Sequence, residues 1–407
     1  MSDQVVIVGG SHAGVSVADH LRKGGFDGTI TMVCAENELP YQRPPLSKAY
    51  MSGDMTLDRL QLRPAEWYDD NKIDLRLGIT AISIDRASQH LHISDGEPLP
   101  YGALVLATGA TPRTLPENVG GSLKNVHVMR SLSDAHALMD KMKSGADIVV
   151  IGGGYIGLEA AAEAAKKDLH VTVIEAADRI LRRVACAETS DVFRALHERY
   201  GVTILENTQI AEITADEHGA CHSVKLANGE QIRANIVIVG IGIAPNVELA
   251  IGADLLVDGG IVVDDHARTT DPNIYACGDC SLLPFKGERT RLESVQNAND
   301  QGAAVADNIA GKDRAYRPEP WFWSDQFDMK LQIAGLNRGY DAVVTRPGKR
   351  EGSRSHFYFA KGKFLAVDCM NDAAVYAMSR RILASDATLT PEQAANQGFN
   401  LKSLLSV

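Results

Sequence analysis

The sequence predicts an α/β fold built on parallel sheets, because a strand–glycine–helix unit occurs twice in the chain. The first unit contains the apolar run from Val5 to Val8, the glycines of GGSHAG and a helical pattern from Ala13 to Leu21. The second unit, DIVVIGGGYIGLEAAAEAAKK, repeats this arrangement from residue 147 onward. A third segment, 321–407, contains short apolar strands and an end helix after Pro391, which predicts a small additional α/β domain.

Each glycine of these units has its own physical task. A tight turn after the strand needs Gly9 or Gly152, and close approach of a pyrophosphate favours another glycine, Gly154. A third small residue, Gly14 or Gly157, lets the following helix lie close to the sheet. The start of that helix offers unpaired N–H groups and a positive dipole to phosphates. The sequence therefore predicts two Rossmann-like dinucleotide-binding domains.

An acidic residue ends the second strand of each unit: Glu36 closes TITMVCAE and Glu175 closes HVTVIE. A carboxylate at this position accepts hydrogen bonds from ribose hydroxyls. The first unit departs from the glycine pattern, because Ser11 stands where the middle glycine is expected. Taken alone, that unit could be a glycine turn in a sheet that binds no nucleotide. Its pairing with the second unit and with Glu36 favours the nucleotide site.

Two further glycine segments predict how the domains are connected. LVLATGATPR and IVIVGIGIAPN each end an apolar strand in glycines, as expected where the chain passes from one domain to the other. The second unit is therefore expected to be inserted into the first domain. The predicted domains are a split dinucleotide-binding domain, 1–112 with 245–320, an inserted dinucleotide-binding domain, 113–244, and a C-terminal domain, 321–407.

Composition excludes several classes of protein. The net charge of −11 argues against nucleic acid as a partner. No run of eighteen apolar residues predicts a membrane span, and MSDQVVIVGG has no basic stretch typical of a signal peptide. The six widely spaced cysteines do not form the framework of a secreted disulfide-rich protein. We therefore expect a cytoplasmic protein, a monomer or a dimer, without nucleic-acid or membrane partners.

The stretch YACGDC holds two cysteines, Cys277 and Cys280, in C-x-x-C spacing around Gly278 and Asp279. Such a pair can be a redox-active disulfide or half of a metal site. No second C-x-x-C or histidine cluster completes a tetrahedral zinc site, so no metal is predicted. The remaining interpretations are a redox couple and a structural pair that flanks Asp279.

The order of these motifs, ending in Y-A-x-G-D, resembles the two-dinucleotide-binding flavoprotein reductases with a glutathione-reductase-like fold. RPPLSK and PWFWSDQ, residues 43–48 and 320–326, are similar to the oxygenase-coupled NADH–ferredoxin reductases. Disulfide reductases and peroxidases of this superfamily carry cysteines soon after the first acid, yet residues 37–53 contain none. The segment 113–150, where a thioredoxin-reductase pair would lie, also lacks cysteine. The resemblance therefore implies electron transfer without protein sulfur.

The resemblance implies that the chain uses FAD and NADH and passes electrons to a 2Fe–2S ferredoxin that serves a monooxygenase or dioxygenase. It also implies that the split domain, 1–112 with 245–320, binds FAD, that the inserted domain, 113–244, binds NAD, and that 321–407 is a C-terminal interface domain. The cysteines match no iron–sulfur ligand run, so the cluster is expected on a separate chain. Rubredoxin reductase and NADH oxidase are alternative activities. A flavoprotein that acts through partner binding, like the relatives of apoptosis-inducing factor, is an alternative from another class.

The resemblance also assigns roles to single residues, with Lys48, Glu159 and Trp323 expected to be catalytic. Lys48 is expected near the flavin edge, Glu159 near the nicotinamide and paired with Lys48, and Trp323 near the surface facing the redox partner. Glu175 favours NADH because its charge repels a 2′-phosphate, although Arg183 nearby leaves NADPH open. The residues assigned to FAD are Gly9, Ser11, His12, Ala13, Gly14, Glu36, Arg43, Lys48, Ala107, Arg130, Asp279 and Val295. Those assigned to NAD are Gly152, Gly154, Tyr155, Ile156, Gly157, Glu159, Glu175, Arg183 and Gly242.

Each catalytic assignment has a structural alternative. Lys48 could be a solvated lysine after a proline turn. Glu159 could be an acid near a helix N-terminus, where the dipole favours negative charge. Trp323 could be part of ordinary aromatic packing.

Overall fold

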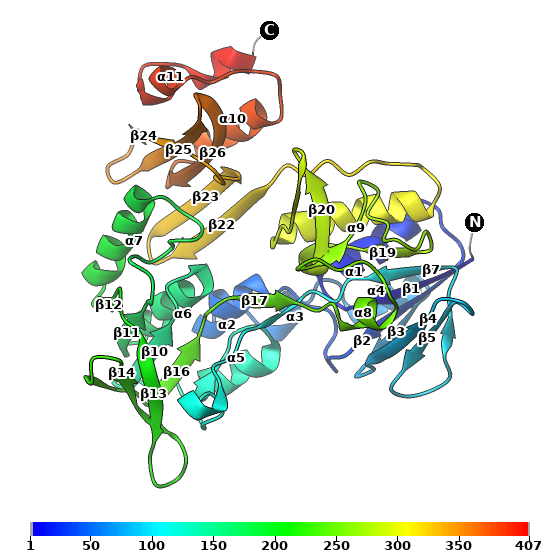
Figure 1. Ribbon diagram of the computed structural model, residues 1–407, viewed down its shortest axis with the longest axis horizontal. Helices are drawn as coiled ribbons and strands as arrows, with labels where there is room; N and C mark the ends of the chain where they lie inside the picture. The colour runs from blue at the N-terminus through cyan, green and yellow to red at the C-terminus, as the bar shows by residue number, and fades with distance from the viewer. Residues whose placement is uncertain (1–2, 406–407) are drawn as a thin grey trace. The chain divides into compact units, whose positions relative to one another are not determined.

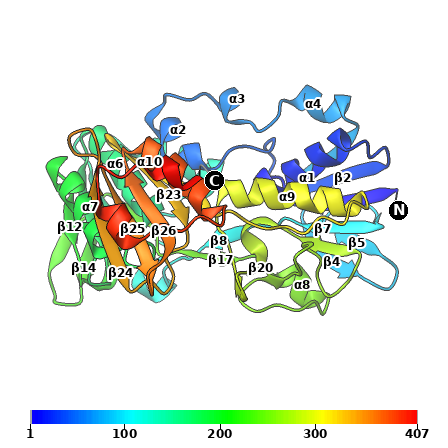
Figure 2. The same cartoon turned by 90° about the horizontal axis from the view of Figure 1, so that it is seen from above.

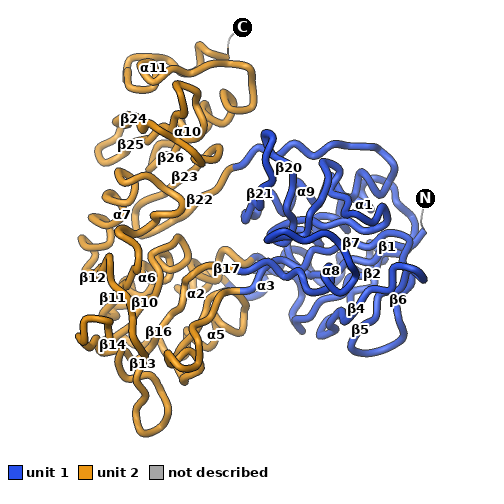
Figure 3. Tube along the Cα trace, viewed as in Figure 1, with its two compact units in different colours: residues 1–42, 56–111, 244–320 blue, residues 43–55, 112–243, 321–407 orange. Residues whose placement is uncertain are grey.

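The computed structural model describes residues 3–405, which form two compact units (Figure 3). Unit 1 contains the described residues up to Gln42 together with 56–111 and 244–320. Unit 2 contains 43–55, 112–243 and the described residues from Trp321 onward. The chain leaves unit 1 at strand β8 (Ala110–Pro112) and returns to it at strand β17 (Ile243–Pro245).

The main sheet of unit 1 is parallel and has the strand order β19–β7–β1–β2–β3. Its central strands are buried on both faces, which explains why they read as continuous apolar runs rather than as alternating patterns. The strands are β1 (Gln4–Val8), β2 (Thr29–Cys34), β3 (Ile73–Leu77), β7 (Ala103–Leu106) and β19 (Ile274–Ala276).

Two helices from distant parts of the sequence, α1 (His12–Lys23) and α9 (Val295–Ile309), lie side by side in unit 1 (Figures 1 and 2). Their close approach requires Gly302, because a Cβ there would lie 2.8 Å from the carbonyl oxygen of Ala13. The Ser16 hydroxyl donates across the contact to the carbonyl oxygen of Asn299 at 2.6 Å. The return of the chain thus completes the domain that its first residues begin.

Smaller elements complete unit 1. Two three-stranded sheets have the orders β4–β5–β6 and β18–β20–β21. The elements are α3 (Leu57–Leu60), α4 (Ala65–Asp70), β4 (Ala81–Asp85), β5 (His90–Ile93), β6 (Leu99–Pro100), α8 (Glu248–Gly252), β18 (Ile261–Val262), the 3₁₀ turn η3 (Gly278–Cys280), β20 (Ser281–Phe285) and β21 (Glu288–Thr290).

Unit 2 contains a second parallel sheet, with the order β12–β11–β10–β16–β9. Helix α6 (Tyr155–Lys166) follows β10, as α1 follows β1 in unit 1. An antiparallel sheet with the order β13–β14–β15 lies beyond it in the sequence. The strands are β9 (Val126–His127), β10 (Asp147–Ile151), β11 (His170–Ile174), β12 (Thr203–Leu205), β13 (Ile210–Ala215), β14 (Cys221–Leu226), β15 (Gln231–Arg233) and β16 (Ile236–Val239), and the remaining helical elements are η1 (Pro44–Ser47), α2 (Ala49–Ser52), η2 (Glu117–Val119), α5 (Leu132–Met139) and α7 (Ala187–Arg199).

The C-terminal part of unit 2 is an antiparallel sheet with the order β22–β23–β26–β25–β24. Strands β25 and β26 form a hairpin, and its turn residues Lys361 and Gly362 both have positive φ angles, 49° and 77°. The strands are β22 (Trp321–Gln326), β23 (Met329–Gly335), β24 (Ala342–Pro347), β25 (Arg354–Ala360) and β26 (Lys363–Met370), followed by α10 (Ala373–Leu383), α11 (Pro391–Ala395) and the 3₁₀ turn η4 (Leu401–Leu405).

The predicted fold class, α/β with two Rossmann-like sheets and a small C-terminal α/β part, is confirmed. Helix α11 begins at Pro391 as expected, whereas α10 was not predicted. The domain prediction assigned residues 43–55 to the first domain, but in the structure they cluster with unit 2, as the C-terminal part also does. No helix within residues 3–405 is long and apolar enough to cross a membrane.

A buried carboxylate joins the C-terminal sheet to α7. Asp368 of β26 is fully buried, and its Oδ2 accepts hydrogen bonds from the Thr189 hydroxyl of α7 at 2.8 Å and from the Tyr358 hydroxyl of β25. Its Oδ1 has no partner among the described residues. Burial raises the pKa of Asp368 to about 6 despite the two donors.

The raised pKa of Asp368 predicts how stability depends on pH. The folded protein binds the proton of the Asp368 carboxyl group more tightly than the unfolded chain does. This difference stabilises the fold fully below the unfolded pKa of about 4, and the stabilisation is lost as pH rises through the folded pKa of about 6. Asp368→Asn removes this loss and keeps an oxygen acceptor for both hydroxyls. Thermal unfolding should therefore show that the variant gains stability relative to the wild type as pH rises from about 4 to about 6, with a constant difference above that range. The exposed Asp386→Asn is the control, and parallel curves for wild type and Asp368→Asn would contradict the assignment.

Candidate functional site

The glycine turn of unit 2 is built so tightly that larger residues cannot replace its first and last members. Gly152 has φ of +107°, and a Cβ there would lie 2.4 Å from the carbonyl oxygen of Gly240. A Cβ on Gly157 would lie 2.2 Å from the carbonyl oxygen of Gly152. Gly154 is different, because a Cβ there would meet nothing within 4 Å. The middle position therefore leaves open space in front of the helix.

Helix α6 begins at this open space. Gly154 is its N-cap residue, no side chain caps the first turn and no acidic residue stands in that turn. The two residues that follow, Tyr155 and Ile156, begin the helix, and Ile156 is 42% exposed although it is apolar. The first N–H groups of the helix have no partners within it and can bind an anion. The turn thus fits the pyrophosphate of a dinucleotide.

Glu175, which follows β11, is anchored to the same turn. Its Oε2 accepts the N–H of Gly153 at 2.7 Å, and its Oε1 accepts the N–H of Ala177 at 2.8 Å. Each carboxylate oxygen keeps a further lone pair that can accept a ribose hydroxyl. The other two predicted residues, Arg183 and Gly242, lie together, since a Cβ on Gly242 would be 3.5 Å from the Arg183 guanidinium.

The glycine turn of unit 1 repeats this geometry. Gly9 has φ of +120°, and a Cβ there would lie 2.2 Å from the carbonyl oxygen of Ala107. A Cβ on Gly14 would lie 2.0 Å from the carbonyl oxygen of Gly9. Ser11 is the N-cap of α1 but makes no capping hydrogen bond with its side chain, and His12 is the first helical residue. Serine is therefore compatible with a phosphate-binding turn here.

Other residues predicted to contact FAD in unit 1 lie at the ends of its elements. The half-buried Glu36 follows β2 and accepts a hydrogen bond from the Tyr41 hydroxyl. Val295 is the first residue of α9, whose N-cap Ser294 accepts the N–H of Asn297 at 3.1 Å. The half-buried Asp279 lies in η3, and Ala13 begins the buried face of α1.

Gln301 of α9 holds the turn that carries Asp279, a role that was not predicted from the sequence. Its fully buried side-chain oxygen accepts hydrogen bonds from the Gly278 N–H and from the Ser281 hydroxyl, both at 2.9 Å. A buried polar residue in a helix produces no spacing pattern, so only the three-dimensional arrangement identifies it.

The two cysteines of YACGDC are free and completely buried. The Cys280 thiol donates to the carbonyl oxygens of Leu106 and Cys277, each at 3.4 Å. Burial raises the pKa of both thiols, which disfavours the reactive thiolate. These observations favour the structural interpretation over the redox couple.

Unit 2 contains an ion pair between Lys48 and the buried Glu159. The expected pair is present, with Lys48 Nζ 2.5 Å from Glu159 Oε2. Glu159 is 3% exposed, and the hydroxyls of Ser47 and Ser324 donate to its two oxygens at 2.9 Å and 2.6 Å. Burial raises the pKa of Glu159, and Lys48 and the two serines oppose this shift. Ser47 and Ser324 were not identified from the sequence as partners of Glu159.

The segment that carries Lys48 is fixed to the rest of unit 2 by two further contacts. The Arg43 guanidinium donates to the carbonyl oxygen of Arg130 at 2.9 Å, which brings together two residues predicted to contact FAD. The Tyr50 hydroxyl and His136 Nε2 are 2.7 Å apart and share a hydrogen bond. Lys48 therefore extends from a segment held at three points and is not a solvated surface lysine.

Strand β22 presents different side chains on its two faces, because successive residues of a strand alternate. Phe322 contacts Tyr155 of α6, with ring centroids 5.0 Å apart, and Ser324 contacts Glu159 of the same helix. The half-buried Trp323 belongs to the other face, and its ring centroid is 5.7 Å from that of Trp321. Glu159 and Trp323 are thus associated with opposite faces of one strand.

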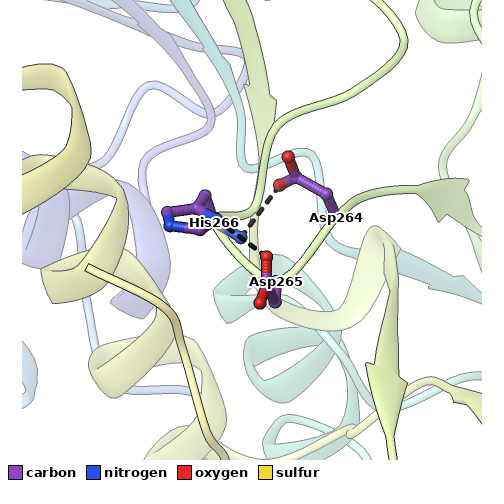
Figure 4. A group of neighbouring side chains, drawn as sticks. All are labelled: Asp264, Asp265 and His266. Carbon is purple, nitrogen blue, oxygen red and sulfur yellow. Dashed lines mark hydrogen bonds and ion pairs between the residues drawn. The ribbon is translucent and has the colours of Figure 1, made fainter. Parts of the chain in front are cut away.

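Figure 4 shows a group of acidic and histidine side chains in unit 1, Asp264, Asp265 and His266. Local hydrogen bonds account for its geometry. Asp264 Oδ1 accepts the N–H groups of His266 at 2.9 Å and Arg268 at 2.8 Å, which closes the turn after β18. The His266 ring nitrogens lie 2.7 Å from Asp265 and 3.3 Å from Asp313. The proximity of these side chains therefore does not by itself indicate a metal site.

Comparison with known proteins places these features in a family. The model for pyridine nucleotide-disulphide oxidoreductases matches residues 3–302, and the reductase C-terminal model matches residues 321–405. Rhodocoxin reductase of Rhodococcus erythropolis is 44% identical, covering 98% of this chain and 93% of its own. A ferredoxin–NAD(P)(+) reductase of a Sphingomonas species is 39% identical over 99% of this chain and 97% of its own. The crystal structure of the covalent putidaredoxin reductase–putidaredoxin complex superposes with a TM-score of 0.96 at 38% identity, covering 99% of this chain and 98% of the other.

The buried cysteines allow a direct test. A Cys277→Ala/Cys280→Ala variant should keep its flavin and its NADH-dependent electron transfer, because neither thiol is positioned as a reactive thiolate. Removing two buried sulfur atoms should lower stability by about 1–2 kcal/mol. The visible flavin spectrum and steady-state turnover check the expectation, with the buried Cys221→Ala as the matched control. Lost turnover with full flavin content would show that the pair is a redox couple.

Proposed function

Because the chain belongs to the pyridine nucleotide-disulphide oxidoreductase family, we propose that it is an FAD-containing reductase that oxidises NADH and reduces a 2Fe–2S ferredoxin. The observation that carries the proposal is the presence of two glycine turns, each followed by its own acid, Glu36 and Glu175, without a redox-active cysteine. Two dinucleotide sites accommodate two cofactors. Electrons must then leave for an acceptor on another polypeptide.

We propose that each predicted domain has its own role. Residues 1–112 and 245–320 hold FAD, 113–244 hold NADH, and 321–407 supply the interface for the ferredoxin. FAD, when bound, accepts a hydride from NADH and returns electrons singly to a one-electron acceptor. The protein is expected to work in the cytoplasm beside the oxygenase that its ferredoxin serves.

The residues of the chain bind and orient these groups. The turns at Gly9 and Gly152 offer helix N–H groups to the two pyrophosphates. Glu175 accepts ribose hydroxyls and repels a 2′-phosphate, which favours NADH. Lys48 supplies a positive charge where negative charge develops, and Glu159 holds its ammonium group in place.

The function is tested with purified protein and three electron acceptors: a 2Fe–2S ferredoxin, rubredoxin and oxygen. NADH should bleach the flavin rapidly and NADPH should do so much more slowly. Cytochrome c reduction should depend on a 2Fe–2S ferredoxin of an oxygenase system. Faster electron transfer to rubredoxin or directly to oxygen would overturn the proposal in favour of a rubredoxin reductase or an NADH oxidase.

Lys48→Ala should slow flavin reduction by NADH on the order of 10²-fold, because a positioned cation is lost at the site of charge development. Stopped-flow absorbance measures this rate, and flavin content measures FAD binding separately. Because the single variant leaves Glu159 buried without its cation, the Lys48→Ala/Glu159→Gln variant is the matched control. Slow reduction in both variants supports the role of the cation. Normal reduction in Lys48→Ala would remove Lys48 from the mechanism.

Trp323→Ala should lower ferredoxin-dependent cytochrome c reduction severalfold while NADH-to-ferricyanide activity stays near the wild-type value. The reason is that large aromatic side chains dominate the energetics of protein interfaces. Trp323→Phe, which keeps part of the apolar surface, should have an intermediate effect. A parallel fall in both activities would show that Trp323 supports the flavin site rather than the partner.

A further inference from the structure

A chain of buried hydrogen bonds runs from α7 through β22 to Glu159. His197 Nε2 lies 2.8 Å from the side-chain oxygen of Gln326, whose amide nitrogen donates to the Ser324 hydroxyl at 3.0 Å. The Ser324 hydroxyl donates in turn to Glu159 Oε1 at 2.6 Å. His197, Ser324 and Gln326 are all 0% exposed.

All the hydrogen bonds of this series run in one direction, from His197 to Glu159. Because the Gln326 amide nitrogen faces Ser324, its oxygen faces His197, and His197 must donate from Nε2. Nδ1 of His197 then carries no proton, which agrees with its burial without a partner among residues 3–405. Burial also lowers the pKa of His197 to about 4, so the ring is neutral. The Ser324 oxygen accepts from Gln326, and its proton is therefore directed to Glu159.

The direction has a chemical consequence for Glu159. The Ser324 hydroxyl donates to Oε1, while the Ser47 hydroxyl and the Lys48 ammonium group donate to Oε2. Because both oxygens act as acceptors and the ammonium group faces one of them, the arrangement favours the ionised carboxylate. If these hydrogen bonds ran in the opposite direction, Glu159 would have to be protonated and would donate to Ser324, beside the ammonium group of Lys48. The donors Ser324, Ser47 and Lys48 together oppose the cost of burying the charge.

Few other charges act on this carboxylate. Lys48 is the charged group that faces it from the segment after η1, and Tyr155 is the titratable group on its own helix that senses its charge. Asp325 of β22 belongs to the opposite face of that strand from Ser324. Further along α6, Glu163 pairs with Lys166 at 2.7 Å. Asp147 and His170, at the starts of β10 and β11, pair with each other at 3.2 Å.

We propose that Ser324, supported by Gln326 and His197, is a positioning residue that keeps the Glu159 carboxylate ionised and directed at Lys48. The C-terminal part of the chain thereby sets the charge state of a group in the NAD-binding part. The consequence for catalysis rests on the proposed function, because it requires that the pair of Lys48 and Glu159 takes part in reduction by NADH.

The charge state of Glu159 can be measured without turnover. Infrared difference spectra across an acid titration report the carboxylic-acid C=O band, and the Glu159→Gln variant identifies the part of the band that belongs to Glu159. Ser324→Ala should move the protonation midpoint of Glu159 upward by about one pH unit or more, since a hydrogen bond to a charged group is lost. Ser324→Thr, which retains the hydroxyl, should keep the wild-type midpoint.

Two further variants keep the test decisive. Ser355→Ala is the matched control, because it removes another fully buried hydroxyl of the C-terminal sheet, one that donates to Asp372 at 3.2 Å, and it should leave the Glu159 midpoint unchanged. Ser324→Cys carries a weaker donor and should raise the midpoint even if Ser324→Ala does not fold. An unchanged midpoint in Ser324→Ala or Ser324→Cys would overturn the positioning role.

The same variants separate this inference from the proposed function. With both correct, the pH at which flavin reduction by NADH loses half its rate moves upward together with the infrared midpoint in Ser324→Ala. A shifted infrared midpoint with an unshifted reduction profile supports the positioning role of Ser324 and overturns the role proposed for Glu159 in reduction.

Discussion

The organisation of unit 2 depends on the burial of one carboxylate. Glu159 lies on helix α6, where the residues that follow it are mostly alanines. Their side chains have no hydrogen-bond donors, so the helix itself cannot compensate the cost of removing the charge from water. Compensation comes from Lys48 and Ser47 in one segment and from Ser324 in another, which are distant in the sequence. Assembly of unit 2 therefore requires that these three segments meet, and a misplaced segment would leave a charge unpaired in the interior.

Local rules account for what could be predicted from the sequence. The glycine turns follow from steric limits within a few residues. The close approach of Gly9 to Ala107 and of Gly152 to Gly240 shows that the two turns have the same geometry. The hairpin at Lys361 and Gly362 follows equally from backbone preferences. Sequence patterns of this kind report the geometry of a residue and its near neighbours.

Non-local partners could not be predicted in the same way. Ser324, Gln326 and Gln301 are polar residues in buried positions, and nothing in their spacing states which group they satisfy. The family resemblance indicated that Lys48 and Glu159 belong together, but not that two serines complete the pair. Helix α10 was not predicted because the amphipathic pattern of its short sequence is a weaker signal than the patterns of the strands that precede it. The helix is stabilised by packing on the C-terminal sheet.

The cysteines of this chain have a practical consequence. All six thiols are free and buried, and desolvation raises the pKa of each, so the native protein should resist alkylation and oxidation in air. A cysteine introduced at an exposed position would then react far faster than the native ones. Spectroscopic probes could therefore be attached at chosen exposed positions of either unit without first removing any natural thiol.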